Sequence, residues 1–512
     1  MGRLDGFAKL TACPAWPTFM SADINFDNSY ARLAGAFYRR QLPVPVAEPR
    51  YIAANRPLAE RLGIDPDWLS SDQGLAVMAG NAVPPGADPL AMAYGGHQFG
   101  QWVPQLGDGR ALLLGEIIDR DGIRRDLHLK GAGATPFSRG GDGRSSIGPV
   151  VREYLGCEAM AALGIPSTRA LAAVSSGEAV ERNGSEPGGI LCRVATSHVR
   201  VGTFEYFARS GRSDEVCQLA DHVIARNYPE LREADHPYLA LLEAVIKRTA
   251  GLVSAWMQVG FIHGVMNTDN TSIVGETIDF GPFGFLDEFA PDTAYSYIDR
   301  RGRYAYNQQP AIAQWNLARL AECLLPLLDA DQPTALEQAN ATLATFQSTF
   351  ERDFQAGLVR KIGLDGGGKE DVELALALLD EMARQHADMT LTFRYLGDLS
   401  GSSDQADEIV RRLFDQPQAF DRWASDWRAR LQANGIADSE RRAAMQAVNP
   451  AFILRNHLAQ QAVDAAIEHL DFQPMQRLMR VLSKPFQDQP EHADLAQPPA
   501  SDERVLTTFC GT

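Results

Sequence analysis

Two short polar segments near the middle of the chain constrain its fold more than any other feature. The first ends in Asp269-Asn270, and the second, Asp279-Phe280-Gly281, begins nine residues later. Carboxylate and amide oxygens are ligands that Mg²⁺ accepts alongside the phosphates of a nucleoside triphosphate. Either segment alone could be an ordinary polar turn, in which Asn and Asp bond to the backbone. Together they predict a metal and phosphate site, with Asn270 and Asp279 as the metal ligands.

The residues before Asn270 extend this pattern. A run that starts at His263-Gly264 and ends in Asn, followed by Asp-Phe-Gly, is typical of the catalytic core of protein kinases. Protein kinases place their catalytic Asp two residues after the His, and this chain has Val265 there. We therefore expect the metal site without the usual base, and Asp269 is the remaining candidate base. His263 is expected to hold the loop in shape through hydrogen bonds to the backbone.

Composition argues against several classes of protein. The 512 residues are 45% hydrophobic, which suffices for a large core, and they carry a formal net charge of −17. This charge argues against nucleic acid or an anionic membrane as a partner. The six cysteines are widely spaced, with no Cys-x-x-Cys pair, which indicates neither a zinc cluster nor a disulfide framework. No apolar run approaches the length of a membrane span, so we expect a cytoplasmic protein.

The pattern along the chain predicts an α+β protein with two lobes. Residues 1–85 mix short helical patterns with Pro-rich connections, and are expected to form an extension packed on the core. Residues 86–207 are rich in strand patterns and glycine turns, and residues 208–483 are mostly helical. Residues 484–512 are polar and largely Pro-rich, as in a mobile tail. Strands first and helices later is the order of a two-lobed, protein-kinase-like fold with an extension at each end.

Several elements can be placed from apolar periodicity and turn residues. The pattern predicts a buried strand over 111–118 and a half-buried strand over 127–130, joined by a hairpin turn at 119–122. A helix is expected over 148–163, because a proline suits its first turn and a glycine ends it. Apolar residues at helical spacing predict further helices over 239–259, 371–395, 451–470 and 475–482.

A second set of residues suits a nucleotide. Gly107, Gly109 and Arg110 stand just before the first predicted strand, where glycines let backbone N–H groups approach phosphate and an arginine adds a charge-assisted contact. The same residues also make ordinary hairpins. Lys130 ends a strand and Glu153 follows on the next helix, which is the order in which kinase-like folds grip the α- and β-phosphates. A surface lysine and a solvated glutamate are the alternative for this pair.

Arginines occur in two further places. Residues 131–144 are rich in glycine and contain two arginines, so they could fold around an anion or form a flexible linker. Arg193 shares one face of a predicted strand with Leu191 and Ala195, which would bury its guanidinium and require an anionic partner. Arg200 lies in a similar alternating stretch, and both arginines could instead face water. Close to the strands that line the adenine pocket of kinases, they would suit phosphate better than a purine.

Motifs spread over nearly the whole chain carry a family resemblance. They occupy residues 94–100, 104–110, 130–139, 263–270 and 279–285, with Asn449-Pro450 and Arg455-Asn456 further on. With these motifs the chain resembles the selenoprotein O family of protein adenylyltransferases. The resemblance implies a kinase-like fold that binds ATP in reversed orientation. It also implies transfer of AMP to Ser, Thr or Tyr hydroxyls of proteins, with release of pyrophosphate.

The resemblance assigns a role to each candidate residue. Asp269 would act as the base on the incoming hydroxyl, and Glu153 would pair with Lys130. Asn270 and Asp279 would bind Mg²⁺, with Mn²⁺ as the alternative ion. The terminal phosphates would lie in what is otherwise the adenine pocket. The residues that contact or enclose ATP would be Gly107, Gly109, Arg110, Lys130, Asp142, Gly143, Arg193, Arg200 and Asp279.

Two other activities fit the same residues. One is a conventional ATP-dependent phosphotransferase, and the other is an inactive nucleotide-binding pseudokinase scaffold, which Val265 permits. The expected partners are ATP and proteins with accessible hydroxyl side chains, with redox proteins and the chain itself as candidates. Eukaryotic members of the family are mitochondrial and carry selenocysteine near the C-terminus, where this chain has Cys510. Cys510 is a candidate reactive thiol.

Overall fold

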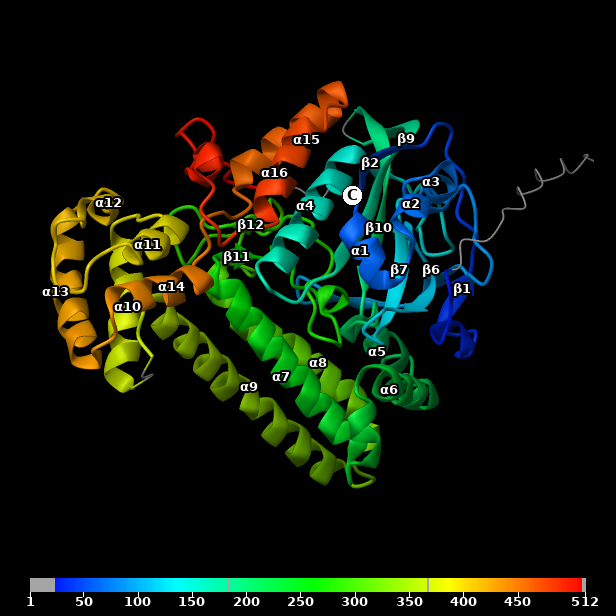
Figure 1. Ribbon diagram of the computed structural model, residues 1–512. Helices are drawn as coiled ribbons and strands as arrows, with labels where there is room; N and C mark the ends of the chain where they lie inside the picture. Colours follow the sequence, from blue (N-terminus) through cyan, green and yellow to red (C-terminus); the bar gives the residue numbers. More distant parts are fainter. Residues whose placement is uncertain (1–23, 183, 366–367, 509–512) are drawn as a thin grey trace, which may run out of the picture.

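The structure is a computed structural model that describes residues 24–182, 184–365 and 368–508. Strands dominate its N-terminal part up to Ala195, and helices dominate the remainder (Figure 1). This division confirms the predicted order of a strand-rich part followed by a helical part. No described helix combines the length and the apolar character that a membrane span requires.

Among the described residues, eight strands form one antiparallel sheet in the order β1-β3-β6-β7-β10-β9-β2, and β8 pairs with β10. The edge strands β1 and β2 both come from the first 85 residues, so this segment forms part of the sheet as well as packing on it. The strands are β1 Tyr38–Arg40, β2 Arg50–Ala54, β3 Leu90–Met92, β6 Ala111–Ile118, β7 Arg124–Lys130, β8 Ser145–Ser146, β9 Arg169–Glu181 and β10 Ser185–Ala195.

Alternation of side chains along the central strands decides which residues can reach a site. Leu127 and Leu129 of β7 are buried in an apolar core shared with three short helices. Successive strand residues point to opposite faces, so the other face of the sheet carries His128 and Lys130, with Arg193 paired to His128 on β10. The three short helices are α1 Arg56–Leu62, α2 Pro66–Leu69 and α3 Asp72–Met78.

Helix α4, Ile147–Ala162, covers this second face of the sheet. It contacts β9 and β10 on one side and the C-terminal helices α15, Asn456–His469, and α16, Gln473–Leu482, on the other. Most of its residues are buried, which explains why its apolar pattern is nearly continuous. The helix lies one residue before the predicted range, and β6 spans the predicted strand residues.

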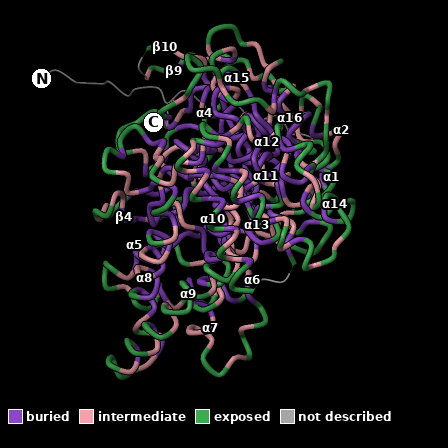
Figure 2. Tube along the Cα trace, turned by 90° about the vertical axis from the view of Figure 1, so that its left-hand side faces the viewer, coloured by how far each residue is buried: buried purple, intermediate pink, exposed green. Residues whose placement is uncertain are grey.

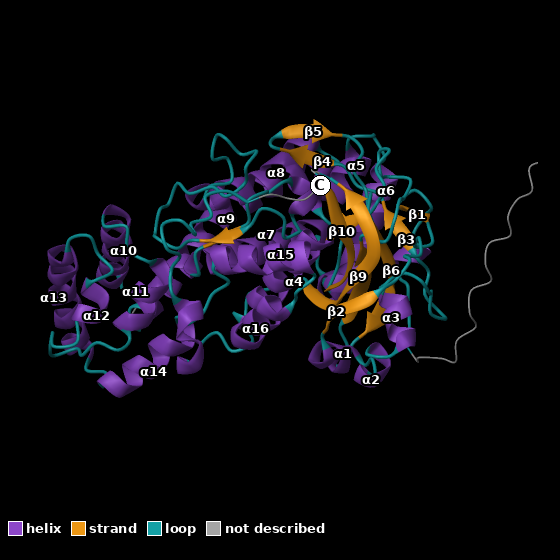
Figure 3. Ribbon diagram, turned by 90° about the horizontal axis from the view of Figure 1, so that it is seen from above, coloured by secondary structure: helices purple, strands orange, loops and turns teal. Residues whose placement is uncertain are grey.

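The helical part extends away from the sheet. Helices α7, α8 and α9 pack side by side (Figure 1), and α10–α14 lie at the end of the molecule farthest from the sheet (Figure 3). Buried residues gather along the interior between these elements (Figure 2). The helices are α5 Val201–Ala208, α6 Ser213–Asn227, α7 Pro237–Gln258, α8 Gln309–Leu328, α9 Gln332–Lys361, α10 Lys369–Arg384, α11 Met389–Leu396, α12 Glu408–Arg411, α13 Pro417–Asn434 and α14 Asp438–Val448.

Two predicted helices differ from the structure. The single helix expected over 371–395 is two helices, because His386 adopts φ +51° after α10, and the Asp388 side chain then accepts from Leu391 N to cap α11. The helix expected over 451–470 begins only at Asn456. Its first five residues are an irregular buried segment, whose apolar side chains imitate helical spacing.

Two small hairpins complete the frame. Strands β4, Gly96–Gln98, and β5, Gln101–Val103, form a hairpin beside the main sheet. Strands β11, Phe261–Ile262, and β12, Gly284–Phe285, pair with each other and close the base of the loop formed by residues 263–283. This loop contains both polar segments of the predicted metal site.

The C-terminal segment packs against the body, which differs from the mobile tail expected from residue 484 onward. Arg394 donates to Asp488, and Leu495 is buried. Thr508 lies beside Ser296 in a parallel bridge, and its N–H donates to Tyr295 O at 2.7 Å. Much of the segment is exposed, which agrees with its polar composition, and these few long-range contacts attach it to the body. Cys510 lies outside the described residues.

Candidate active site

The loop of residues 263–283 is held in shape from behind. His263 is buried, and its Nε2 lies 2.9 Å from Ile278 O, directly before the Asp-Phe-Gly segment. The amide of Asn316 on α8 donates to Met266 O at 3.0 Å. Asp269 and Asn270 lie in a short 3-10 turn, Thr268–Asn270. The structural role expected for His263 is thus confirmed, and the loop presents Asp269, Asn270 and Asp279 from a fixed frame.

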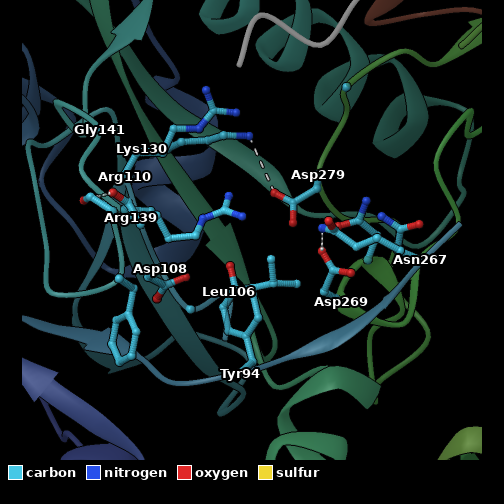
Figure 4. A pocket seen from close by; sticks show the side chains of 18 of the residues that line it. Tyr94, Leu106, Asp108, Arg110, Lys130, Arg139, Gly141, Asn267, Asp269 and Asp279 are labelled. Atoms are coloured by element: carbon cyan, nitrogen blue, oxygen red, sulfur yellow. Dashed lines mark hydrogen bonds and ion pairs between the residues drawn. The ribbon is translucent and has the colours of Figure 1, made fainter. Parts of the chain in front are cut away.

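A pocket of about 610 Å³ lies between this loop and the sheet. Figure 4 shows Lys130, Asp269 and Asp279 pointing into it from different elements. Of the candidate site residues, only Glu153 does not line the pocket, because it lies behind Lys130. The candidate residues that line it are Gly107, Gly109, Arg110, Lys130, Asp142, Gly143, Arg193, Arg200, Asp269, Asn270 and Asp279.

Three cations converge on Asp279. Arg193 Nη1 donates to its Oδ1, Arg200 Nη1 donates to its Oδ2 at 2.7 Å, and Lys130 Nζ lies 3.5 Å from Oδ1. Burial alone would raise the pKa of the Asp279 carboxyl, but the two guanidinium groups and the ammonium hold it well below its usual range. Asp279 is therefore ionised, and it adopts φ +56°, an uncommon backbone conformation for a residue with a side chain.

Glu153 on α4 completes a buried charge cluster. Its Oε2 accepts from Lys130 Nζ at 2.5 Å, and its Oε1 accepts from Arg193 Nη1 at 3.0 Å. The predicted pair of strand lysine and helix glutamate is therefore present. Three cations pair with two carboxylates here, Glu153 and Asp279, and their N–H groups are charge-assisted donors that suit an anionic ligand.

Arg193 is fixed from its other side by a buried histidine. Arg193 Nη2 lies 3.1 Å from Nδ1 of His128, and Nε2 of the same ring lies 3.2 Å from Oδ2 of Asp108. A guanidinium can only donate, so Nδ1 accepts and the ring proton is on Nε2, facing the carboxylate. Burial lowers the pKa of His128, which agrees with a neutral ring. The guanidinium plane of Arg193 is thus held by His128, Glu153 and Asp279.

Asp269 is another carboxylate of the pocket, and its environment differs from that of Asp279. It is 7% exposed, its Oδ2 accepts from Gln98 Nε2 at 3.2 Å, and its Oδ1 has no hydrogen-bond partner among the described residues. Burial raises the pKa of Asp269 to about 6, against the opposing effects of Arg200 and Gln98. A carboxylate with a pKa close to neutrality and spare acceptor capacity can take a proton from a hydroxyl group.

Asn270 and Asp279 both line the pocket and offer oxygen ligands. The Asn270 amide donates through Nδ2 to Val265 O at 3.0 Å, so its carbonyl oxygen remains available as a ligand. The described residues contain no group of three or more His, Cys, Asp or Glu side chains placed to hold a metal ion. One carboxylate and one amide fit Mg²⁺, which usually retains water and substrate phosphates as its other ligands.

Comparison with known proteins is consistent over nearly the whole chain. The model of the protein adenylyltransferase SelO family matches residues 20–483. The chain belongs to this family. It is 57% identical over 493 residues to the protein nucleotidyltransferase YdiU of Rhodopseudomonas palustris (strain BisB5), covering 96% of this chain and all of the relative. It is 58% identical over 503 residues to YdiU of Alkalilimnicola ehrlichii, covering 98% of this chain and all of that relative.

Membership in the SelO family makes this chain an enzyme of the protein nucleotidyltransferase class. It agrees with the unusual features of the site, which keeps the Asp-Phe-Gly carboxylate and has Val265 where a kinase has its base.

In this SelO family member the glycine segment at residues 107–109 packs against the glycine-rich loop of residues 131–144. Gly107 has φ +67°, and a Cβ on it would lie 2.4 Å from the Phe137 ring.

Residues 131–144 form a folded loop that lines the pocket, which argues against the flexible linker left open by composition. Gly133 N donates to Gly143 O at 3.0 Å, and a Cβ on Gly143 would lie 2.1 Å from the Gly133 backbone. Asp142 lies on the pocket rim, where both terminal nitrogens of Arg182 bond to it at 3.0 Å. These hydrogen bonds lower the pKa of Asp142.

Sequence analysis missed several residues of the pocket. Arg182, Gln98 and Asn267 line it, and none of them was assigned a role from the sequence. Gln98 and Asn267 do lie inside the family motifs at residues 94–100 and 263–270, which could have drawn attention to them. Asn267 Oδ1 accepts from Tyr304 O–H at 2.7 Å, a contact between residues 37 positions apart that no local pattern reveals.

Proposed function

We propose that this SelO family member transfers AMP from ATP to Ser, Thr or Tyr side chains of other proteins and releases pyrophosphate. The convergence of Lys130, Arg193 and Arg200 on Asp279 supports this best. The side chains of both arginines are nearly inaccessible, at 2% and 3% exposure. Guanidinium groups buried in this way need anionic partners. Asp279 and Glu153 already supply such partners. The triphosphate tail would add phosphate oxygens as further anionic acceptors, whereas a purine offers none.

This arrangement favours transfer of the nucleotide half of ATP. With the β- and γ-phosphates held among the arginines, the α-phosphorus faces the mouth of the pocket. The acceptor oxygen then forms a bond to the α-phosphorus, and the bond between that phosphorus and the bridging oxygen of the β-phosphate breaks. The hydroxyl proton passes to the Asp269 carboxylate, and pyrophosphate leaves with the electron pair. Lys130, Arg193 and Arg200 stabilise the charge that develops on pyrophosphate.

Asn270 and Asp279 are the residues that would hold Mg²⁺. Both oxygens of Asp279 already accept from guanidinium groups, but a carboxylate has about four acceptor positions and can share them. When bound, the ion supplies charge neutralisation and orientation of the phosphates. Mn²⁺ prefers the same oxygen ligands.

The proposal includes a two-lobed arrangement of the kinase kind, with residues 86–207 and 208–483 as the lobes. Its support is the position of the pocket between the sheet and the loop of residues 263–283, and the pair formed by Lys130 and Glu153. In kinase-like folds the same pair grips phosphates from the strand-rich lobe.

Labelled ATP tests the reaction directly. The chain is incubated with Mg²⁺, a mixture of soluble proteins, and ATP that carries the label on the α- or on the γ-phosphate. We expect the α-label to remain on protein, in the chain itself or in others, and the γ-label to appear in pyrophosphate. A γ-label on protein would favour a conventional phosphotransferase. Binding of ATP without label on any protein would favour an inactive scaffold. The Asp279→Ala variant is the control for contaminating activities.

A further inference from the structure

An exposed loop forms one side of the pocket mouth. We call residues 297–303 the rim loop. Ile298 lines the pocket and is nevertheless 65% exposed, and its neighbour Tyr297 is 52% exposed. Isolated apolar residues on a surface need no explanation, but two adjacent large ones beside a pocket offer a contact area to a partner.

The base of the rim loop is well held. Asp299 is buried, and its two carboxylate oxygens accept from Arg303 N at 2.9 Å and Tyr304 N at 2.7 Å. The Arg303 guanidinium lies 5.0 Å from the ring centroid of Trp315. From the C-terminal segment, Thr508 O accepts from Tyr297 N at 3.3 Å. The loop is therefore preformed, and its tip points Tyr297 and Ile298 outward without a need for folding on contact.

The tip of the rim loop also carries positive charge. Arg300 and Arg301 are exposed, and neither forms an ion pair within the described part of the chain. Arg139, in the loop of residues 131–144, is also exposed and lines the pocket. These arginines stand out on a chain whose formal net charge is −17. Their attraction for acidic groups is local, and it is not part of a general basic surface.

The nucleotide does not account for Arg300 and Arg301. Neither of them lines the pocket, whereas the cations expected to contact ATP, which are Arg110, Lys130, Arg193 and Arg200, all do. The net charge of the chain disfavours nucleic acid as the partner of so small a basic area. A protein that brings its hydroxyl group to the pocket must instead pass the rim loop.

We propose that the rim loop is the docking surface for the acceptor protein, and that it selects hydroxyl residues flanked by acidic residues and an apolar residue. This inference rests on the proposed function, because it concerns the acceptor of the same reaction. Arg300 and Arg301 attract the acidic residues, and Tyr297 and Ile298 contact the apolar one. Charges at the edge of an interface act mainly on encounter and selection. The charge preference is therefore expected in KM more than in kcat.

Peptides with a single threonine test this selection. Three otherwise identical peptides carry glutamate, glutamine or lysine on both sides of the threonine, and AMP transfer to each is measured at saturating ATP. For the unaltered enzyme we expect kcat/KM to be about tenfold higher with glutamate than with lysine. The double variant Arg300→Glu/Arg301→Glu should reverse this order while the Kd for ATP stays unchanged. If all three peptides also carry a leucine near the threonine, Ile298→Ser should raise the KM for each of them.

The matched control is Arg412→Glu/Arg422→Glu. It changes the net charge equally with two exposed arginines on the far helices, and it should keep the preference for glutamate. Equal use of the three peptides by the unaltered enzyme, or the same preference in both double variants, would overturn the inference and leave the proposed function standing. An oligonucleotide whose binding is lost in Arg300→Glu/Arg301→Glu, with peptide preference unchanged, would overturn it too. Failure of the unaltered enzyme to transfer AMP to any protein or peptide would overturn both.

Discussion

Gln98 donates a hydrogen bond through Nε2 to Oδ2 of Asp269 at 3.2 Å. The two residues are 171 positions apart, and the β4–β5 hairpin brings them together by packing on the loop of residues 263–283. The amide is the one described side chain that donates to this carboxylate. It favours the ionised form of Asp269, whereas burial favours the protonated form.

Asp269 should impose an acid limit on the reaction. As a base it must be ionised, and its pKa is raised by burial to about 6, above the usual carboxyl value. We therefore expect kcat/KM to be about half of its plateau near pH 6, to fall further at lower pH, and to be flat from about pH 7 upward. Asp269→Asn should reduce kcat and remove this limb from the pH profile. A profile of the unaltered enzyme that stays flat down to pH 4.5 would contradict this role.

Replacement of Gln98 should move that acid limit. In Gln98→Leu the ionised carboxylate loses its donor, so the pKa of Asp269 should rise further and the limb should shift toward higher pH by about one unit. At pH 8, where Asp269 is ionised in either case, kcat should change little. Gln101→Leu is the matched control, because Gln101 is exposed on the same hairpin and has no hydrogen bond to Asp269. Identical profiles for Gln98→Leu and Gln101→Leu would argue that Gln98 is merely structural.

The residues of the pocket also illustrate how much the sequence could predict. The order of glycine segment, strand lysine, helix glutamate and Asp-Phe-Gly identified Lys130, Glu153 and Asp279, because each occupies a fixed place in a local pattern. The alternation around Arg193 correctly indicated a buried guanidinium with an anionic partner. Its neutral partner, His128, lies on a neighbouring strand, and only the register of β7 and β10 places the two side by side.

Other features depend on tertiary contacts that leave no local trace. The pairing of Arg182 with Asp142 joins residues 40 positions apart, and the glycine-rich composition around Asp142 does not indicate this partner. The end of α10 depends on a left-handed His386, a conformation that apolar periodicity does not predict. Polar composition suggested a mobile tail after residue 484, although a single buried residue such as Leu495 can anchor a polar segment.

Removal of Asp279 should harm both stability and activity, and more than removal of Asp269. Asp279→Ala leaves Arg193 and Arg200 buried without this partner, and breaking a buried ion pair typically costs about 3–5 kcal/mol. We expect a clearly lower Tm and a loss of AMP transfer of about a thousandfold or more, because the proposed metal ligand is lost as well.

Pyrophosphate provides a test of the cause of that instability. If the arginines are destabilising because they lack an anion, then pyrophosphate should raise the Tm of Asp279→Ala more than that of the unaltered enzyme. Asp269→Asn is the matched control, since it removes a pocket carboxylate that does not pair with either guanidinium side chain. An equal rise in Tm for all three proteins would show that pyrophosphate does not act as the missing anionic partner of Arg193 and Arg200 in Asp279→Ala.

Lys361 should make stability depend on pH, away from the active site. It is 3% exposed at the end of α9, its Nζ lies 4.5 Å from the ring centroid of Phe393, and it forms no ion pair with a described residue. Burial lowers its pKa to about 7, whereas a lysine in the unfolded chain titrates near 10.4. Between these values the unfolded chain binds the extra proton, so Lys361 makes stability rise with pH across this window. Below pH 7 the buried group is charged, and its full penalty remains.

Lys361→Met removes this penalty at little change in volume. We therefore expect the variant to have a Tm about 2 °C or more above that of the unaltered chain at pH 6, and a difference that shrinks as the pH approaches 10. Lys369→Met serves as the control, since Lys369 is 89% exposed and its charge is solvated in both states. Thermal unfolding of the three proteins at pH 6, 7.5 and 9.5 distinguishes an effect of the buried charge from an effect of packing. A gain that is the same at pH 6 and pH 9.5 would mean that Lys361→Met acts through packing against Phe393 and not through the buried charge.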